Sequence, residues 1–260
     1  MKRLIALLRH PLTKDLGIDD ARTTLLRQQI VREKRFLAQL YREWNATLGA
    51  AIPAGPGRVL ELGSGGDVLR EFIPDLVTSN ILALPQLDLQ TLGESLPFAD
   101  ESLKAIVMTN VFHHISDVRA MLHEAARVTR PGGRMAMIEP WNTAWSRVVY
   151  RHLHHEPFEP ATLDWALPAG GGPLSSANGA LPWIVFARDR ARFAEEFPEW
   201  TISSITPFMP LAYVLSGGVA SRVGAPGGAY GFVRRMEQRL PQGLCAMFAT
   251  IVLDRNACRT

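Results

Sequence analysis

The alternation of apolar and polar positions divides the chain into a helical beginning and a longer remainder. Between residues 20 and 48, apolar side chains recur at roughly helical spacing with charges between them, and no glycine or proline interrupts them. Asp19 and Asp20 precede this stretch and are suitable N-caps. The pattern predicts a long amphipathic helix, broken at most once, followed by a linker at residues 51–57.

From residue 58, short apolar runs alternate with helical ones, which is typical of βαβ units around a parallel sheet. The pattern predicts strands at 58–62, 75–80, 104–110, 134–140, 200–206 and 246–253. It predicts helices at 116–129, between Ser116-Asp117 and Pro131, and at 188–197.

Two long segments interrupt this rhythm, at about 141–187 and at 208–243. Loops of that length inside a compact domain are usually functional or disordered. The first segment is rich in tryptophan, which argues against disorder: Trp141, Trp145, Trp165 and Trp183. We expect a helical lid at 1–53 and one domain at 54–260 that carries both insertions.

Composition and charge exclude several classes of protein. Apolar residues make up 47% and charged residues 20% of the 260 residues, as in a globular chain with a core. No stretch approaches the ~18 uninterrupted apolar residues of a membrane span, and the apolar run Leu4 to Leu8 is too short for a secretory signal. Cys245 and Cys258 show no disulfide or zinc spacing, so we expect a cytoplasmic protein.

The net charge of +3 has much of its positive excess before residue 42, on the predicted amphipathic helix. Such a face can make weak peripheral contact with an anionic membrane or bind an acidic substrate. A solvated helix face carries the same pattern. We expect no nucleic-acid partner.

The most informative stretch is VLELGSGG, from Val59 to Gly66. A strand that ends in an acid and continues into G-x-G-G brings bare backbone close to a ligand at the carboxyl end of the sheet. A dinucleotide site would need a third glycine at Val68, so that fingerprint fails. Glu61 instead suits a ligand that carries an ammonium group.

VLELGSGG resembles motif I of the class I S-adenosylmethionine-dependent methyltransferases, especially the small-molecule type (methyltransferase type 11-like). The stretch ESLPFADESLKAIVMTNVFHHISDVRAMLHEAARVTRPGGRMAMIEP resembles the middle of the same family, with its LPF, HH and PGG pieces in order. The resemblance implies an α/β fold with a Rossmann-like, seven-stranded, mostly parallel sheet and helices on both faces. It also implies insertions after strands 5 and 6, and S-adenosylmethionine as the cofactor.

By that resemblance the cofactor would be held by Glu61, Gly63, Ser64, Gly65, Asn80, Leu96, Asn110 and Val111. Asn80 stands where the family usually has an acid that binds the ribose hydroxyls, and the exchange forfeits roughly 1 kcal/mol. Leu92 stands where many relatives have an aspartate that contacts the adenine amine. Asp88 could compensate if the loop ran differently.

Candidate catalytic groups occur in two places. His113 and His114 follow a strand end that faces the cleft, and histidine can take a hydroxyl proton near neutral pH. The second place is the segment HLHHE at 152–156, where His155 or Glu156 could be a base or an acceptor contact. On a helix His152 and His155 would share one face while His154 points elsewhere. This spacing matches no zinc signature, so we expect no metal.

Glu139 and Trp141 close the strand at 134–140, where an acid and an aromatic ring suit a hydroxylated acceptor, although Trp141 could equally be core. We therefore expect methyl transfer from S-adenosylmethionine, most simply to a hydroxyl of a small metabolite or a saccharide. Two alternatives stay open. One is a non-catalytic binding or regulatory protein that keeps the fold; the other is a peripheral membrane enzyme for a lipid-linked acceptor.

Overall fold

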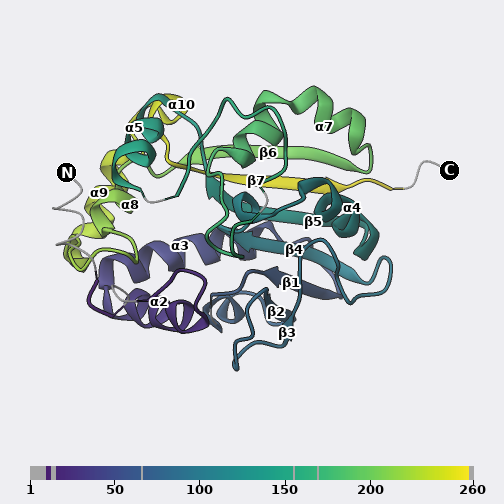
Figure 1. Cartoon of the computed structure of the whole chain (residues 1–260), viewed down its shortest axis with the longest axis horizontal. Coiled ribbons are helices and arrows are strands. Elements are labelled where there is room, and N and C mark those ends of the chain that lie inside the picture. Colours follow the sequence, from purple (N-terminus) through teal and green to yellow (C-terminus); the bar gives the residue numbers. More distant parts are fainter. Residues whose placement is uncertain (1–9, 13–15, 66, 155, 169, 258–260) are drawn as a thin grey trace.

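The computed structural model describes residues 10–12, 16–65, 67–154, 156–168 and 170–257. Through them runs a seven-stranded sheet of order β3-β2-β1-β4-β5-β7-β6 (Figure 1). Its strands are β1 Arg58–Leu62, β2 Leu76–Asn80, β3 Leu89–Gln90, β4 Leu103–Thr109, β5 Thr129–Pro140, β6 Trp200–Phe208 and β7 Phe248–Arg255. The α-helices are α2 Ala21–Glu33, α3 Arg35–Ala51, α4 Val118–Val128, α5 Ala144–Leu153, α6 Leu181–Trp183, α7 Arg190–Glu196, α8 Ala212–Ser216, α9 Tyr230–Glu237 and α10 Gln242–Cys245.

The sheet is parallel from β3 to β5, and β7 then runs antiparallel to both β5 and β6. The predicted fold class and all six predicted strands are confirmed. The two-residue strand β3 was missed, because so short a segment carries no periodicity. Parallel strands end at one edge of the sheet, so the turns after β1, β2 and β4 meet there.

Strand β4 shows how the sheet divides the core into two layers. Ile106 and Met108 pack with α4, α6 and α7, whereas Ala105 and Val107 face the layer that contains α3. Since successive side chains of a strand point to opposite faces, a continuous apolar run is what a strand buried on both faces requires.

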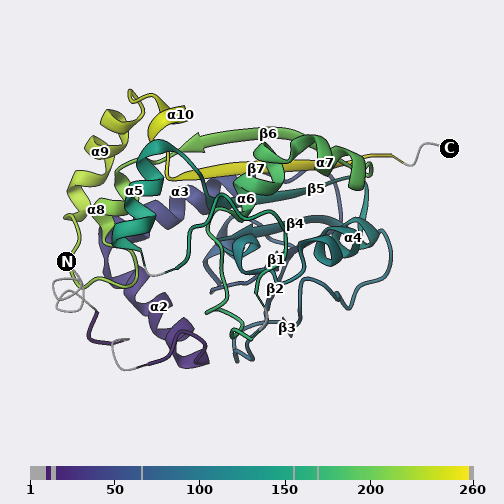
Figure 2. The same cartoon turned by 45° about the horizontal axis from the view of Figure 1, so that its top comes forward.

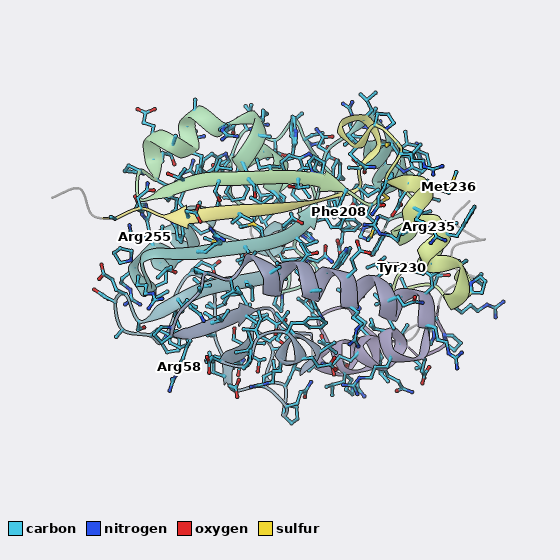
Figure 3. All side chains as sticks on the ribbon, turned by 180° about the vertical axis from the view of Figure 1, so that it is seen from behind. Arg58, Phe208, Tyr230, Arg235, Met236 and Arg255 are labelled. Carbon is cyan, nitrogen blue, oxygen red and sulfur yellow. The ribbon has the colours of Figure 1, made fainter. Side chains whose placement is uncertain are left out.

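The predicted N-terminal helix is broken once, at Lys34, into α2 and α3. The carboxylate of Asp20 accepts the N–H of Arg22 at the start of α2. Helix α3 belongs to the core, with Trp44 fully buried, and the Tyr230 hydroxyl of α9 donates to Glu43 on α3 (Figure 3). The division at residue 53 stays a prediction; within it α2, together with Ile18 and Tyr41, lines the cavity described below.

Both insertions are folded in the described residues. A short 3-10 turn, η1 (Asp67–Glu71), follows β1, and a second, η2 (Phe112–His114), follows β4. Two further short elements fall in the insertions, the π-helical turn η3 (Ile184–Arg188) and the 3-10 turn η4 (Gly227–Ala229).

Helices α2 and α5 lie at the same end of the sheet (Figures 1 and 2). Within the described part of the chain, no helix is long and apolar enough to cross a membrane.

Candidate active site

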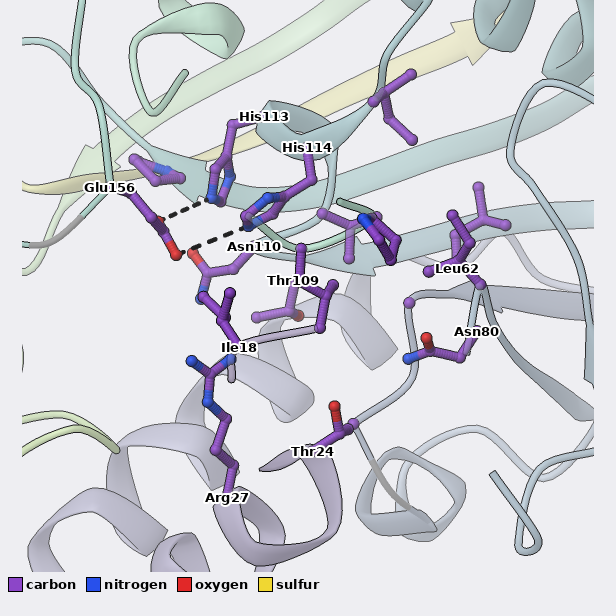
Figure 4. A pocket seen from close by; sticks show the side chains of 18 of the residues that line it. Ile18, Thr24, Arg27, Leu62, Asn80, Thr109, Asn110, His113, His114 and Glu156 are labelled. Carbon is purple, nitrogen blue, oxygen red and sulfur yellow. Dashed lines mark ion pairs between the residues drawn. The ribbon is translucent and has the colours of Figure 1, made fainter. Parts of the chain in front are cut away.

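A cavity of about 300 Å³ opens at the carboxyl edge of the sheet. Helix α2 covers it with Thr24, Arg27, Gln28 and Val31, and Pro173 and Leu174 of the first insertion also line it. The strand ends supply another part of its wall: Leu62, Gly63, Gly65, Asn80, Thr109, Asn110 and Val111. A third part comes from His113, His114, Pro140, Tyr150, His154, Glu156, Tyr213 and Phe248. Figure 4 shows the labelled side chains from the strand ends, α2 and the His113–Glu156 region around one space.

The turn after β1 requires glycine at position 63. Gly63 has a φ of +68°, in the left-handed region that favours glycine. A Cβ there would lie inside van der Waals contact of Val111 Cγ2 and 3.1 Å from its Cγ1. Gly65, by contrast, has open space where its Cβ would be. The glycine turn therefore packs backbone against β4's end on one side and leaves backbone exposed to the cavity on the other.

Asn110 ends β4 in a left-handed conformation, with a φ of +55°. Asparagine tolerates this conformation better than most residues, and its N–H is held by the carbonyl of Ile138 at 2.9 Å. Non-glycine residues in this region are uncommon and cluster at functional sites. The twist directs the chain from the strand end into the 3-10 turn that carries both histidines.

Asn80 lies at the end of β2 and lines the cavity, but both ends of its amide already bond within the protein. Its Nδ2 donates to the carbonyl of Ser64 at 3.0 Å, and its Oδ1 accepts the N–H of Leu82 at 2.9 Å. An aspartate could not make the first of these bonds, because a carboxylate has no donor. This gives a physical reason for asparagine where the family resemblance leads one to expect an acid.

Asp88 does not compensate for Leu92. Its carboxylate accepts the N–H and hydroxyl of Thr78, at 2.7 and 2.9 Å, and pairs with Arg70 at 2.5 Å, away from the cavity lining. These bonds hold the pKa of Asp88 below its usual value, against the opposing effect of burial. Leu92 does line the cavity and is 49% exposed, and it lies between Thr91 and Glu94, which also line the cavity.

His113 is enclosed between two carboxylates. Its Nδ1 lies 2.6 Å from Oε2 of Glu139, and its Nε2 lies 3.4 Å from Oε2 of Glu156. The other oxygen of Glu139 accepts the N–H groups of Val111 and Phe112, at 2.7 and 2.8 Å. Burial lowers the pKa of His113, but the two carboxylates outweigh it and raise the pKa to about 9. His113 is therefore positively charged at neutral pH.

His114 has the opposite character. Its Nδ1 lies 2.9 Å from the carbonyl oxygen of Ser176, which fixes the proton on Nδ1 and leaves Nε2 with a lone pair, 3.8 Å from Oε1 of Glu156. Burial and the charge of His113 lower the pKa of His114 to about 4. Burial alone would raise the pKa of Glu156, yet its hydrogen bond and charge interactions with His113 hold it well below the usual range. The cluster thus joins one cation, one neutral imidazole and two carboxylates.

The structure brings Gly63, Gly65, Asn80, Asn110, Val111, His113, His114 and Glu156 of the predicted site to the cavity wall. Three other predicted cofactor residues are not part of that wall: Glu61, Ser64 and Leu96. Leu96 is a core residue whose N–H donates a hydrogen bond to the carboxylate of Glu124. Ser64 is buried, and its N–H donates a hydrogen bond to the carbonyl of Ser79. His155 lies outside the described residues.

The structure decides three points at the acceptor end that the sequence left open or placed differently. Helix α5 ends at Leu153, so His152 is exposed and His154 is the histidine that lines the cavity. Trp141 is 6% exposed and packs in the core, so it offers no stacking surface. Glu139 is fully buried and contacts the His113 turn rather than an acceptor.

The sequence pattern did not indicate several cavity residues. Arg27 comes from α2, and Tyr150, Tyr213 and Phe248 come from α5, α8 and the start of β7. Each looks in the sequence like an ordinary amphipathic or core position. Only the arrangement of α2, α5 and α8 over one strand edge groups them.

Comparison with known proteins relates part of this chain to a family of methyltransferases. Residues 61–137 match the family described as a methyltransferase domain. A protein named uncharacterized methyltransferase from Mycobacterium tuberculosis is 33% identical, over 37% of this chain and 44% of that protein. A demethylmenaquinone methyltransferase from a Mycobacterium species is 34% identical, over 43% of this chain and 56% of that protein. The chain spans about half the length of the curated relatives it matches.

Among solved structures, the geranyl diphosphate C-methyltransferase of Streptomyces coelicolor A3(2) covers 88% of this chain and 83% of its own, with a TM-score of 0.52 at 12% identity. At that identity the likeness shows the fold. The chain has the fold of a class I methyltransferase, and its residues 61–137 match the methyltransferase family. The family match ends at residue 137, within β5, and the likeness of fold extends over most of the chain. The Streptomyces structure is a complex with Mg²⁺, geranyl diphosphate and S-adenosyl-L-homocysteine.

Proposed function

We propose that this chain transfers the methyl group of S-adenosylmethionine to a hydroxyl of a small metabolite. The observation that carries the proposal is that one cavity joins the glycine turn after β1 to the cluster of His113, His114 and Glu156. About 300 Å³ lies at the small end of the range of ligand pockets. A small acceptor fits this space better than a macromolecule.

The residues at the cavity's strand edge fit the cofactor in part. Gly63 and Gly65 offer close approach of backbone for its methionine part, beside Asn110. Asn80 keeps one lone pair on Oδ1 for a ribose hydroxyl, since the other accepts from Leu82. Leu92 offers apolar contact to an adenine ring but no acceptor of its own for the ring's amine, so any side-chain acceptor on this loop would be Thr91 or Glu94, which line the same cavity.

S-adenosylmethionine supplies, when bound, an electrophilic methyl group that leaves a neutral thioether behind. The chain's own task is alignment and removal of the acceptor's proton. In the metal-free protein, Nε2 of His114 is the group that accepts this proton as the new bond to oxygen forms, because His113 already carries its proton toward Glu156.

The acceptor end favours an apolar or aromatic molecule over a saccharide. Tyr150, Tyr213 and Phe248 line it, and the tryptophan that a sugar would have stacked on is in the core. Arg27 adds positive charge from α2, which we propose closes over the bound ligands as a lid. Demethylmenaquinone, which would take the methyl group on a ring carbon instead of a hydroxyl, is the contrasting acceptor to screen, because relatives of that activity by name align with the chain.

The decisive experiment is calorimetric titration of the purified chain with S-adenosylmethionine and with S-adenosylhomocysteine. Micromolar binding of both is expected, and no binding up to millimolar ligand would refute the proposal. A gain-of-function variant sharpens the test. Leu92→Asp adds an acceptor at an exposed position and should tighten binding by about 1 kcal/mol, about fivefold.

The matched control is Leu163→Asp, because Leu163 is exposed and does not line the cavity. It should leave the affinity unchanged. If the two variants bind the cofactor with equal affinity, the adenine ring does not lie beside Leu92. Cofactor binding without formation of S-adenosylhomocysteine, across an acceptor panel, would favour the non-catalytic alternative.

A further inference from the structure

Three ligand atoms converge at the acceptor end of the cavity. The Nε2 atoms of His113 and His114 lie 3.4 and 3.8 Å from the two oxygens of Glu156. Figure 4 shows the two rings and the carboxylate pointing toward one another from η2 and from the segment after α5. All three ligand atoms lie within 4.8 Å of one another, and no second such group occurs among the described residues.

A partner at the Nδ1 atom fixes the orientation of each histidine ring. Nδ1 of His113 bonds to the buried carboxylate of Glu139 at 2.6 Å, and Nδ1 of His114 bonds to the carbonyl of Ser176 at 2.9 Å. Histidines that bind metals almost always donate their other ring N–H to a carboxylate or a backbone carbonyl, which fixes the tautomer and the ring orientation. Here two adjacent histidines each have such a partner, and their Nε2 atoms face one carboxylate.

We propose that His113, His114 and Glu156 bind one divalent transition-metal ion, with Zn²⁺ the best match. Two imidazoles and one carboxylate are the protein ligands of several catalytic zinc sites and of related iron sites, whereas Mg²⁺ and Ca²⁺ prefer oxygen ligands throughout. Tetrahedral ligands at about 2.1 Å from an ion are about 3.4 Å apart. The His113–Glu156 distance is 3.4 Å, and His114 needs only a small movement.

The charge of the cluster also favours a cation. Glu139 and Glu156 place two carboxylates around the His113 ring. An ion bound between His113 and Glu156 lies beside a side chain that is only 2% exposed, so little solvent competes with it for the ligands. Sequence spacing gave no sign of this site, because its ligands come from two separate segments.

The role of the ion rests on the proposed function. Three protein ligands leave a coordination position open toward the cavity, where the acceptor's hydroxyl can bind. A divalent ion lowers the pKa of such a hydroxyl, so its proton passes to water before or as the oxygen takes the methyl group. In the metal-loaded protein His114 is then a ligand and no longer the base.

The test uses the full chain, stripped with a chelator and titrated with Zn²⁺ alone by calorimetry. One ion per chain is expected. Glu156→Gln and His114→Gln should each weaken binding at least tenfold, and Glu139→Gln, which changes the partner of His113 Nδ1 without removing a ligand, about 10- to 100-fold. His152→Gln is the matched control, since it removes an exposed histidine outside the cavity, and it should bind like the wild type.

Co²⁺ gives a second readout that needs no variant, because its visible absorption reports nitrogen and oxygen ligands in low-coordinate sites. Stoichiometric Co²⁺ bands that Glu156→Gln abolishes support the site. Absence of one-to-one binding of either ion by the wild type, or equal binding by Glu156→Gln, overturns it. S-adenosylmethionine titrated into the stripped protein reports on the proposed function separately, so either proposal can fail while the other stands.

Discussion

Alanine in place of Gly63 tests whether the turn after β1 is built as the structure shows it. The residue has a φ of +68°, and its missing Cβ lies against the side chain of Val111 at the end of the neighbouring strand. The substitution therefore imposes two separate penalties. One is conformational and independent of neighbours, and the other is steric and depends on Val111.

Their sizes follow from the geometry. A non-glycine residue held in the left-handed region costs roughly 1–2 kcal/mol, and a methyl group forced into a packed contact costs typically about 1–3 kcal/mol. Gly63→Ala should therefore lower the free energy of unfolding by about 2–5 kcal/mol. Gly65→Ala meets open space and has no positive φ, so it should stay within about 0.5 kcal/mol of the wild type.

Urea unfolding of four proteins separates the two penalties: wild type, Gly63→Ala, Val111→Ala and the double variant. Removal of the Val111 methyl groups makes room for the new Cβ, so the double variant should be more stable than the sum of the single effects by about 1–3 kcal/mol. Strict additivity would show that no steric contact exists. A Gly63→Ala variant as stable as Gly65→Ala would refute the turn geometry itself.

Two further predictions concern positions outside the cavity. Lys34 donates to the carbonyls of Gly218 and Ser221, and burial lowers its pKa from 10.5 to about 8. Between those pH values the unfolded chain binds the proton that the folded chain has lost, so the stability of the wild type relative to Lys34→Met should rise with pH across about 8 to 10.5. A flat difference in urea unfolding would contradict this. The Thr143 hydroxyl accepts the N–H of Ser146 in a capping box, so Thr143→Ala should cost about 1 kcal/mol in the same assay. Thr143→Ser should recover most of it.

The sequence predicted the sheet well because its signals are local. In the run KAIVMTN the residues from Ala105 to Met108 are all apolar, so both faces of the strand are apolar. Such a run is typical of a strand that is buried on both faces of a sheet. The glycine turn after β1 likewise follows from the backbone conformations that the chain must adopt there. Even the break at Lys34 is compatible with the helical spacing on either side of it.

Predictions of what side chains do at the acceptor end were less successful. Trp141 and Glu139 occupy the expected strand end, yet one fills the core and the other holds the His113 turn. His154, which helical spacing would have pointed elsewhere, lines the cavity because α5 ends at Leu153. Helical spacing predicts a shared face only while the helix continues.

The sequence by itself determined the class of fold, the order of its strands along the chain and the turn that faces the ligand, because periodicity and backbone conformation are encoded in neighbouring residues. Only the tertiary structure decided which side chains meet. His113 and His114 follow β4, Glu139 ends β5, and Glu156 follows α5. Their charges and tautomers depend on distances of 2.6 to 3.8 Å between those segments. Coulomb and hydrogen-bond energies fall off over such distances in space, and spacing along the chain carries no record of them.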